Sequence, residues 1–423
     1  MRLNIMRIIL AVAMILAFAT TPLLAQGLAW VEVYNNGSDD VAHSIAVATN
    51  GYAYVTGTSN NGSTLDAFIL KVDVYTGDVI WKKSFDNGGN NDESFGIALA
   101  NSTGNPYVIS TSGNGTNTDF RTLLLSASDG TISANKVYDS GSNDACYGLT
   151  VASDASFVYV VGSSFNGTDD DWRIMKYNGT LAAEQWGVVT YDGGFTDVAR
   201  ACTLDLYGNL YVTGYSSNAG IRTIRYSSSG AVKWSSLAGT NGNQAFGIAA
   251  DLYGDVIIAG VSSGASGTDF RVIKYKGADG SVLWDKTYDS GGADFARGVT
   301  TDKFGDVYVV GYSVSGNSNL RIVKFDGADG TQLMTKVYDS DSSDDGWGIV
   351  VDSRLNMYIA GVTGSGVGQD YLILKYGEGV EDDDGSDTLL SQLLRQCGAL
   401  GLDAIIFVGS IYWISRRFRR ARY

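Results

Sequence analysis

Histidine is almost absent from this chain, since His43 is the single histidine among 423 residues. Metal sites that need several histidines are therefore excluded, and a Ser-His-Asp triad would depend on His43 alone. Neither a P-loop nor a dinucleotide-binding glycine motif occurs. No catalytic set can be named from these motifs.

Basic residues are also fewer than acidic residues. The chain has 30 lysines and arginines against 45 aspartates and glutamates, which gives a formal net charge of −15. This balance argues against a nucleic acid as partner and leaves cation binding open. Proline is rarer still, with two residues, whereas glycine reaches 54 and tyrosine 25. Such a composition favours one large β domain over a helical protein.

Seven copies of one sequence unit fill the chain from about residue 30 to residue 376. In the fifth copy the segments AFGIAAD, DVIIAGVS, DFRVIKY and GSVLWDKTYD follow one another, separated by short runs of Gly, Asp, Ser and Asn. The second segment recurs with a period near 50, marked by Tyr54, Tyr107, Tyr159, Tyr211, Ile257, Tyr308 and Tyr358. Four alternating segments at this period are typical of a β-propeller blade. The sequence therefore predicts an all-β fold, a seven-bladed propeller of four-stranded blades over residues 26–377.

The two ends of the repeat region complement each other. The seventh copy stops after DYLILKYGEG, before any fourth segment, whereas WVEVYN at residues 30–35 matches the fourth segment of the other copies. Trp30 aligns with Trp284, and Tyr34 with Tyr288. We expect this N-terminal strand to complete the last blade and to remove the edges that an open ring would expose.

The runs GNLYVTGYS, DFRVIKY and GSVLW resemble the bacterial and archaeal seven-bladed β-propeller repeat known as the SBBP repeat, over about four fifths of the chain. This resemblance implies the propeller fold and an exported interaction or structural module without a common catalytic set. Fold alone says little about activity. The segments TGDVIW and DGSVLW are also similar to the tryptophan-docking segments of quinoprotein dehydrogenases, which carry pyrroloquinoline quinone and calcium.

One repeat position in the inner strands provides the candidate ligand site. It is occupied by His43, Phe95, Tyr147, Arg200, Phe246, Arg297 and Trp347. We expect these residues to begin the inner strands and to ring one mouth of the central channel. Aromatic rings and arginines at a concave mouth suit a glycan, a peptide or a small organic ligand. The alternative is that they share the face of the neighbouring Ile series and fill the space between blades.

Other recurrent positions are interpreted as structural. Small residues such as Ser44 and Gly348 alternate with an Ile-like series and should leave room for large side chains of the next blade. We expect buried ion pairs between an arginine series and an aspartate series, because an unpaired buried charge would be costly. The arginines are Arg121, Arg173, Arg222, Arg271 and Arg321, and the aspartates are Asp86, Asp139, Asp192, Asp289 and Asp339. Adjacent blades should be sealed by Trp30, Trp81, Trp186, Trp234 and Trp284.

Cysteines and acidic loops suggest little chemistry. Cys202 replaces a residue of the Ile series and should pack as a small apolar side chain, and no disulfide is expected with Cys146, which precedes the third inner strand. No cofactor is predicted from a motif. The acidic loops DNGGNNDE, FNGTDDD and DSDSSDD are compatible with structural calcium, although Asp and Asn are also the residues that tight turns prefer.

Both ends of the chain are typical of targeting signals. Residues 1–25 combine a basic start, an apolar run and Ala25 before the cut, as in a cleavable secretory signal peptide. Residues 378–397 form an acidic linker and a short helix-like segment ending at Cys397. Residues 398–423 begin with Gly398, continue with the apolar stretch 400–414, and end in a cluster of Arg416, Arg417, Arg419 and Arg420. Fifteen helical residues span about 22 Å, short of the roughly 30 Å hydrocarbon core, so membrane insertion is marginal but feasible, with the arginines in the cytoplasm.

This tail has two interpretations. A Cys-Gly motif, a short apolar helix and an arginine cluster resemble the tripartite sorting tags of bacterial surface proteins, which a membrane protease cuts. The other interpretation is a permanent tail anchor. In either case the sequence predicts an exported propeller of the cell envelope or cell surface, membrane-anchored or surface-sorted. We expect a non-catalytic binding or structural module for a surface protein or polysaccharide. The alternative is an extracytoplasmic enzyme, either a quinoprotein-like oxidoreductase or a polysaccharide lyase or hydrolase.

Overall fold

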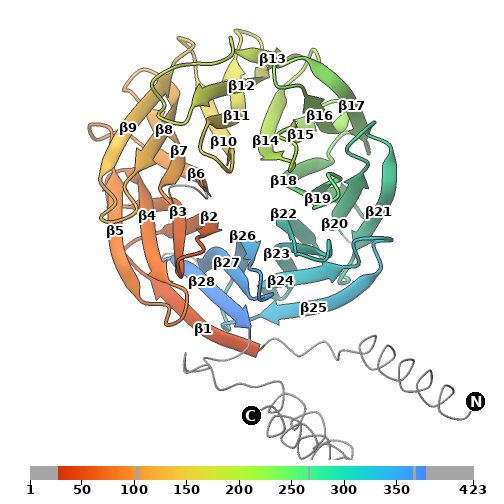
Figure 1. The fold of residues 1–423 in the computed structure, drawn as a ribbon. Helices are drawn as coiled ribbons and strands as arrows, with labels where there is room; N and C mark the ends of the chain where they lie inside the picture. Colours follow the sequence, from red (N-terminus) through yellow and green to blue (C-terminus); the bar gives the residue numbers. More distant parts are fainter. Residues whose placement is uncertain (1–26, 101–103, 265–266, 365–367, 378–423) are drawn as a thin grey trace, which may run out of the picture. The chain divides into compact units, whose positions relative to one another are not determined.

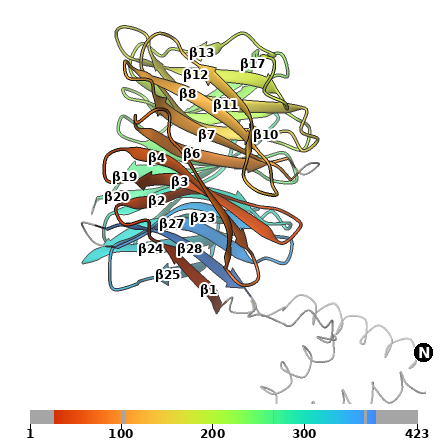
Figure 2. The ribbon, with the colours of Figure 1, turned by 90° about the vertical axis from the view of Figure 1, so that its left-hand side faces the viewer.

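The computed structural model describes residues 27–100, 104–264, 267–364 and 368–377. These residues form seven antiparallel four-stranded sheets, arranged as blades around a central axis (Figure 1). Figure 2 shows the same ring turned by 90°. The predicted all-β, seven-bladed propeller is confirmed.

Each blade runs from an inner strand near the axis to an outer strand at the rim. The inner strands of blades 1 to 7 are β2 (Asp40–Val47), β6 (Asp92–Leu99), β10 (Asp144–Val151), β14 (Asp197–Leu204), β18 (Gln244–Ala250), β22 (Asp294–Thr301) and β26 (Asp344–Val351). The second strands are β3 (Tyr52–Asn60), β7 (Pro106–Gly113), β11 (Phe157–Phe165), β15 (Leu210–Ser216), β19 (Val256–Ser263), β23 (Val307–Ser315) and β27 (Met357–Thr363). The third strands are β4 (Leu65–Asp73), β8 (Thr118–Leu125), β12 (Asp170–Asn178), β16 (Gly220–Tyr226), β20 (Thr268–Tyr275), β24 (Asn317–Phe325) and β28 (Asp370–Gly377). The outer strands are β5 (Val79–Phe85), β9 (Ile132–Tyr138), β13 (Val189–Tyr191), β17 (Val232–Ala238), β21 (Val282–Tyr288), β25 (Gln332–Tyr338) and, in blade 7, β1 (Gly27–Tyr34).

The N-terminal strand closes the ring as expected. Strand β1 pairs with β28, so the first and last strands of the described chain lie side by side (Figure 1). Trp30 pairs with Lys375 in this sheet, just as Trp284 pairs with Lys274 in blade 5. The sequence alignment therefore placed the closing strand in the correct register.

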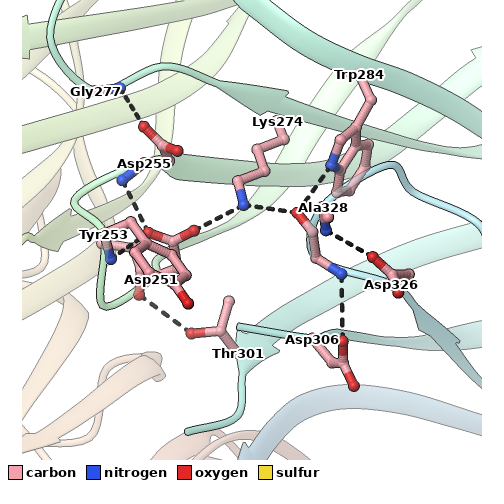
Figure 3. A network of polar contacts seen from close by, with 12 residues as sticks. Asp251, Tyr253, Asp255, Lys274, Gly277, Trp284, Thr301, Asp306, Asp326 and Ala328 are labelled. Atoms are coloured by element: carbon pink, nitrogen blue, oxygen red, sulfur yellow. Dashed lines mark hydrogen bonds and ion pairs between the residues drawn. The ribbon is translucent and has the colours of Figure 1, made fainter. Parts of the chain in front are cut away.

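A clasp of one lysine and one tryptophan joins neighbouring blades. In blade 5, Lys274 and Trp284 both donate to the backbone carbonyl of Gly327 in blade 6, at 2.7 and 3.2 Å (Figure 3). Lys274 is buried and also forms an ion pair with the buried Asp251, at 2.8 Å. A buried ammonium group with several such partners is compensated for its loss of water.

The clasp recurs in four other blades, with an arginine in place of the lysine in blade 4. Its acceptors are the carbonyl of Ala127 for Lys71 and Trp81, of Ser228 for Lys176 and Trp186, of Gly277 for Arg225 and Trp234, and of Val74 for Lys375 and Trp30. The tryptophans thus seal adjacent blades, as predicted, and the clasp onto Val74 joins the last blade to the first.

The expected ion pairs between the Arg and Asp series are wrong. The five aspartates are exposed, and each accepts a backbone N–H within its own turn, from Gly89, Gly141, Gly194, Gly291 and Asp341. Arg121 and Arg321 instead donate to serines of the neighbouring strand, and Arg271 pairs with Asp285. The physical reason is that a tight turn leaves free N–H groups, and the carboxylate two or three residues before such a group satisfies it locally.

The two described cysteines are free and buried. Cys202 is 8% exposed and packs in an apolar cluster with Leu210 and Val212, as expected for a small apolar residue. Cys146 lies within β10 rather than before it.

Several predicted features lie outside the described residues. They are the signal peptide with Ala25, the short C-terminal helix, and the processing and anchor residues Cys397, Gly398, Arg416, Arg417, Arg419 and Arg420. Within the part of the chain that the structure describes, no helix has the length and apolarity needed to span a membrane.

Candidate ligand-binding channel

Every inner strand contains a β-bulge, and the bulged residue belongs to the predicted ligand series. In blade 1, Ala42 pairs with Gly57 and Ser44 pairs with Thr56, so His43 is the extra residue. The same shift makes extra residues of Phe95, Tyr147, Arg200, Phe246, Arg297 and Trp347. A bulge bends its strand and re-aims the extra side chain. These residues therefore lie within the inner strands and do not begin them, which corrects the sequence-based expectation.

In six blades a glycine of the second strand lies against the backbone just before the bulge. A Cβ atom added to Gly214 would lie 1.9 Å from the carbonyl oxygen of Val198, just before the bulge in β14. Equivalent contacts of 1.9 to 2.2 Å are found at Gly57, Gly162, Gly260, Gly311 and Gly361. Blade 2 has Ser110 at this position. The glycine of the GYS, GVS and GSS motifs thus lies where the backbones of the first and second strands approach closely.

All seven bulged residues line one central cavity of about 190 Å³. Their side chains are half-buried. The adjacent small residues have a packing role between the inner strands. A Cβ added to Gly247, Gly298 or Gly348 would lie 2.7 to 3.1 Å from backbone atoms of the next inner strand. The small series therefore lets the inner strands approach each other closely, and at Gly96 and Gly247 it also makes room for the Leu149 and Val299 side chains of the next blade, as expected.

Aromatic contacts link the bulged residues on one side of the cavity. The His43 ring stacks on Phe95 at 4.9 Å and meets Trp347 edge-on at 4.6 Å. Phe95 in turn contacts Tyr147, with ring centroids 5.4 Å apart. Offset and edge-on pairs of this kind stabilise a fixed arrangement of rings. The cavity wall here is apolar and organised before any ligand arrives.

Arg200, Phe246 and Arg297 are the remaining bulged residues of the wall. The Arg200 guanidinium lies 4.2 Å from the Tyr147 ring centroid and 5.7 Å from that of Phe246. Among the described residues it has no hydrogen-bond or ion-pair partner, and its buried Nε atom is unsatisfied. Because the half-buried guanidinium has no acceptor among the described residues, its accessible N–H groups are suited to an acceptor that a ligand supplies.

Arg297 is partly compensated. Its Nε donates to Asp345 at 2.8 Å, and its guanidinium lies 3.6 Å from the Trp347 ring centroid. Burial raises the pKa of Asp345 to about 7, although Arg297 opposes this rise. The Asp345 Oδ1 and Trp347 Nε1 atoms are buried without a partner. Arg200 Nε, Trp347 Nε1 and Asp345 Oδ1 are thus three buried polar atoms without a partner among the described residues, and Asp345 is not one of the residues that line the cavity.

His43 is held in one tautomer. Its Nδ1 lies 2.8 Å from the Ser94 carbonyl oxygen, and because a carbonyl only accepts, Nδ1 carries the proton. Burial lowers the pKa of His43 to about 4. The ring is therefore neutral near pH 7, and Nε2 is left as an acceptor.

Sequence reasoning missed a second layer around the cavity. Phe295 contacts both Phe246 and Arg297, at 4.9 and 4.8 Å, and Tyr312 stacks on Phe295. Phe295 and Asp345 each precede a bulged residue by two positions. The corresponding position in the other blades holds Val41, Glu93, Ala145, Val198 and Gln244. The residue type at this position varies among the blades as strongly as it does at the bulged position. That variation in the sequence could have indicated the second layer.

Comparisons with known proteins support the fold and go no further. No protein-family model matches the chain, and no curated protein matches it. Among solved structures, it is similar to Sqt1 of Chaetomium thermophilum bound to the N-terminus of the ribosomal protein L10, with a TM-score of 0.53 and 12% identity over 81% of this chain and 98% of that one. It is also similar to the polysaccharide lyase Uly1, with a TM-score of 0.50 and 9% identity over 79% of this chain and 89% of that one. At such identities the likeness shows the propeller fold alone.

Proposed function

We propose that this chain is an exported propeller that binds an acidic polysaccharide of the cell surface in its central channel, as a binding module and not as an enzyme. The observation that supports this most is the Arg200 guanidinium, which lines a cavity with aromatic walls and has no acceptor among the described residues. A carboxylate is the group that best matches a guanidinium, and aromatic rings suit the faces of sugar rings. Because the whole chain has a net charge of −15, the two channel arginines are the local feature that would hold an acidic group.

Targeting forms part of the same proposal. Export rests on the signal-like residues 1–25, and attachment to the envelope rests on the apolar and arginine-rich residues 398–423. Processing at Cys397–Gly398 by a sorting protease and retention as a permanent anchor are the two forms of attachment. Membership of the SBBP-repeat proteins rests on the motif resemblance. Intact mass of the mature protein distinguishes the two forms, because retention of the arginine cluster excludes the sorted form.

A binding screen tests the channel. The purified chain is melted with oligogalacturonate, with the neutral counterpart lacking the carboxylate, and with acidic peptides, since a ligand that binds the folded state raises Tm. Oligogalacturonate should raise Tm and the neutral oligomer should not. A shift with acidic peptides alone would replace the polysaccharide by a surface protein as partner. A shift by none of these would contradict the proposal.

An enzyme is the second candidate, and one observation favours it. The Asp345 carboxyl, whose pKa burial raises to about 7, adjoins the cavity through Arg297. A general base works best with a pKa near the working pH, whereas the pKa of about 4 makes His43 a weak base. A polysaccharide lyase would release unsaturated uronates from the acidic oligomer, which ultraviolet absorbance detects. The tryptophan segments that resemble quinoproteins are explained here by the clasps between blades.

A further inference from the structure

Three groups of aspartates lie at equivalent junctions between blades. They are Asp119, Asp139 and Asp144, then Asp171, Asp192 and Asp197, and then Asp269, Asp289 and Asp294. In each trio one carboxylate oxygen per residue lies within 4.8 Å of the others. The first member is on a third strand, the second directly follows the outer strand of the same blade, and the third begins the inner strand of the next blade. Each trio thus joins two blades.

Neighbouring carboxylates in these trios repel each other. Asp144, Asp197 and Asp294 are fully buried, and Asp119 and Asp171 are 4% and 6% exposed. Collected negative charge of this kind is costly unless a positive group compensates it.

Some carboxylate oxygens of the trios are held by hydrogen bonds, and others have no hydrogen-bond partner among the described residues. Asp197 accepts from the Gly193 N–H and from the Ser216 hydroxyl, which holds its carboxylate in one orientation. By contrast, the buried Oδ1 atoms of Asp171 and Asp269 have no hydrogen-bond partner. Arg173 is near the second trio, but its Nη1 lies 3.6 Å from Asp171 Oδ2 and leaves Oδ1 unsatisfied. The Arg271 side chain, from the same strand as Asp269, is bound to Asp285.

Blade 6 provides an internal comparison. Its third strand has Asn319 where the trios have an aspartate, and Asn319 Nδ2 donates to Asp339 Oδ2 at 2.9 Å. An amide N–H therefore lies beside the carboxylate at a junction with one negative charge fewer. The fold forms this junction without a third carboxylate, so blade packing alone does not require the trio.

We propose that each of the three trios binds one divalent cation of the calcium type. Calcium takes several oxygen ligands in flexible geometry, including carboxylates and water. The exposed members Asp139, Asp192 and Asp289 leave each site open to solvent on one side. The sites differ from the acidic loops named in the sequence, of which only FNGTDDD contributes a trio member, Asp171. The proposal is independent of the channel and its ligand.

Equilibrium dialysis of the intact chain with Ca²⁺ tests the proposal. Asp192→Asn should release one equivalent of bound calcium. The matched control is Asp339→Asn, an exposed aspartate at the corresponding place in blade 6, which should release none. Acidic residues elsewhere in the chain contribute equally to both variants. Equal binding by the two variants, or no calcium bound to wild type at millimolar concentration, would overturn the proposal.

A gain-of-site variant provides a second test. Asn319→Asp converts the blade 6 junction into a trio with Asp339 and Asp344, and should add one equivalent of calcium. Chelation should lower the Tm of wild type, since a cation bound to the folded state stabilises it. An unchanged Tm, together with no added equivalent in Asn319→Asp, would also refute the sites.

Discussion

At the scale of single residues, the channel chemistry depends on side chains that the bulges turn toward the axis. His43, Arg200 and Trp347 come from three different blades and line one cavity. Their residue types and their shared repeat position could be predicted from the sequence. Their placement within the strands could not, because a bulge adds a residue to one strand without changing the period of the repeat. Asp345 was missed because its importance arises from Arg297 of the neighbouring blade.

The single histidine gives a direct test of this arrangement. Burial lowers the pKa of His43 to about 4 from an ordinary value of 6.5. The unfolded chain therefore binds this proton more readily, and His43 should cost stability as the pH falls from 6.5 to 4, by at most about 3 kcal/mol. Asp345 acts in the opposite sense, because its raised pKa adds stability as the pH falls from about 7 towards 3.8. The two effects partly cancel in a melting curve.

NMR resolves His43 separately, since no other histidine is present. Titration of the imidazole signals in the folded chain should give a midpoint near pH 4. A midpoint near 6.5 would show that the ring is solvated and outside the packed channel wall.

At the scale of elements, bulges and clasps are the devices that shape each blade. The recurring lysine inside otherwise apolar third strands was a readable signal for the clasp. A charge at one repeat position of a buried strand needs a repeated partner, and the partner is a carbonyl of the next blade. It went unnoticed because the sequence does not show which turn lies across the junction.

Removing the charge of a clasp should be costly. Lys274→Met leaves the buried Asp251 without its ion-pair partner, so we expect a loss of about 3 to 5 kcal/mol in the free energy of unfolding. The control Lys276→Met breaks the exposed pair with Asp279 and should leave the free energy of unfolding nearly unchanged. Urea denaturation of both variants measures the difference, and equal losses would contradict the clasp.

The bulge glycine should not tolerate a methyl group. Gly214→Ala places a Cβ against the Val198 carbonyl and should destabilise the chain by about 1 to 3 kcal/mol. Gly187→Ala is the matched control, because no atom lies within 4 Å of its added Cβ. Thermal melts compare the Tm of the two variants. A Tm of Gly214→Ala equal to that of wild type would mean that the two strands near the bulge can separate at little cost.

At the scale of the whole molecule, closure by β1 makes the ring. The fold class, the number of blades and the closing register could all be predicted, because seven copies and an incomplete last copy leave one arrangement without exposed edges. Deleting residues 27–34 should expose β28 and remove the Trp30 contact with the first blade. Hydrogen exchange at Leu372 and Leu374 should then rise strongly. Protection equal to wild type would show that β28 does not depend on β1.

The central claim is that the channel holds an acidic ligand through Arg200, and isothermal titration with oligogalacturonate tests it most directly. Arg200→Gln should weaken binding about 10-fold or more, because charge-assisted hydrogen bonds contribute about 1.5 to 3 kcal/mol. Arg354→Gln, which removes an exposed arginine outside the cavity lining, should leave the affinity unchanged. Equal affinity of wild type and Arg200→Gln would contradict the account.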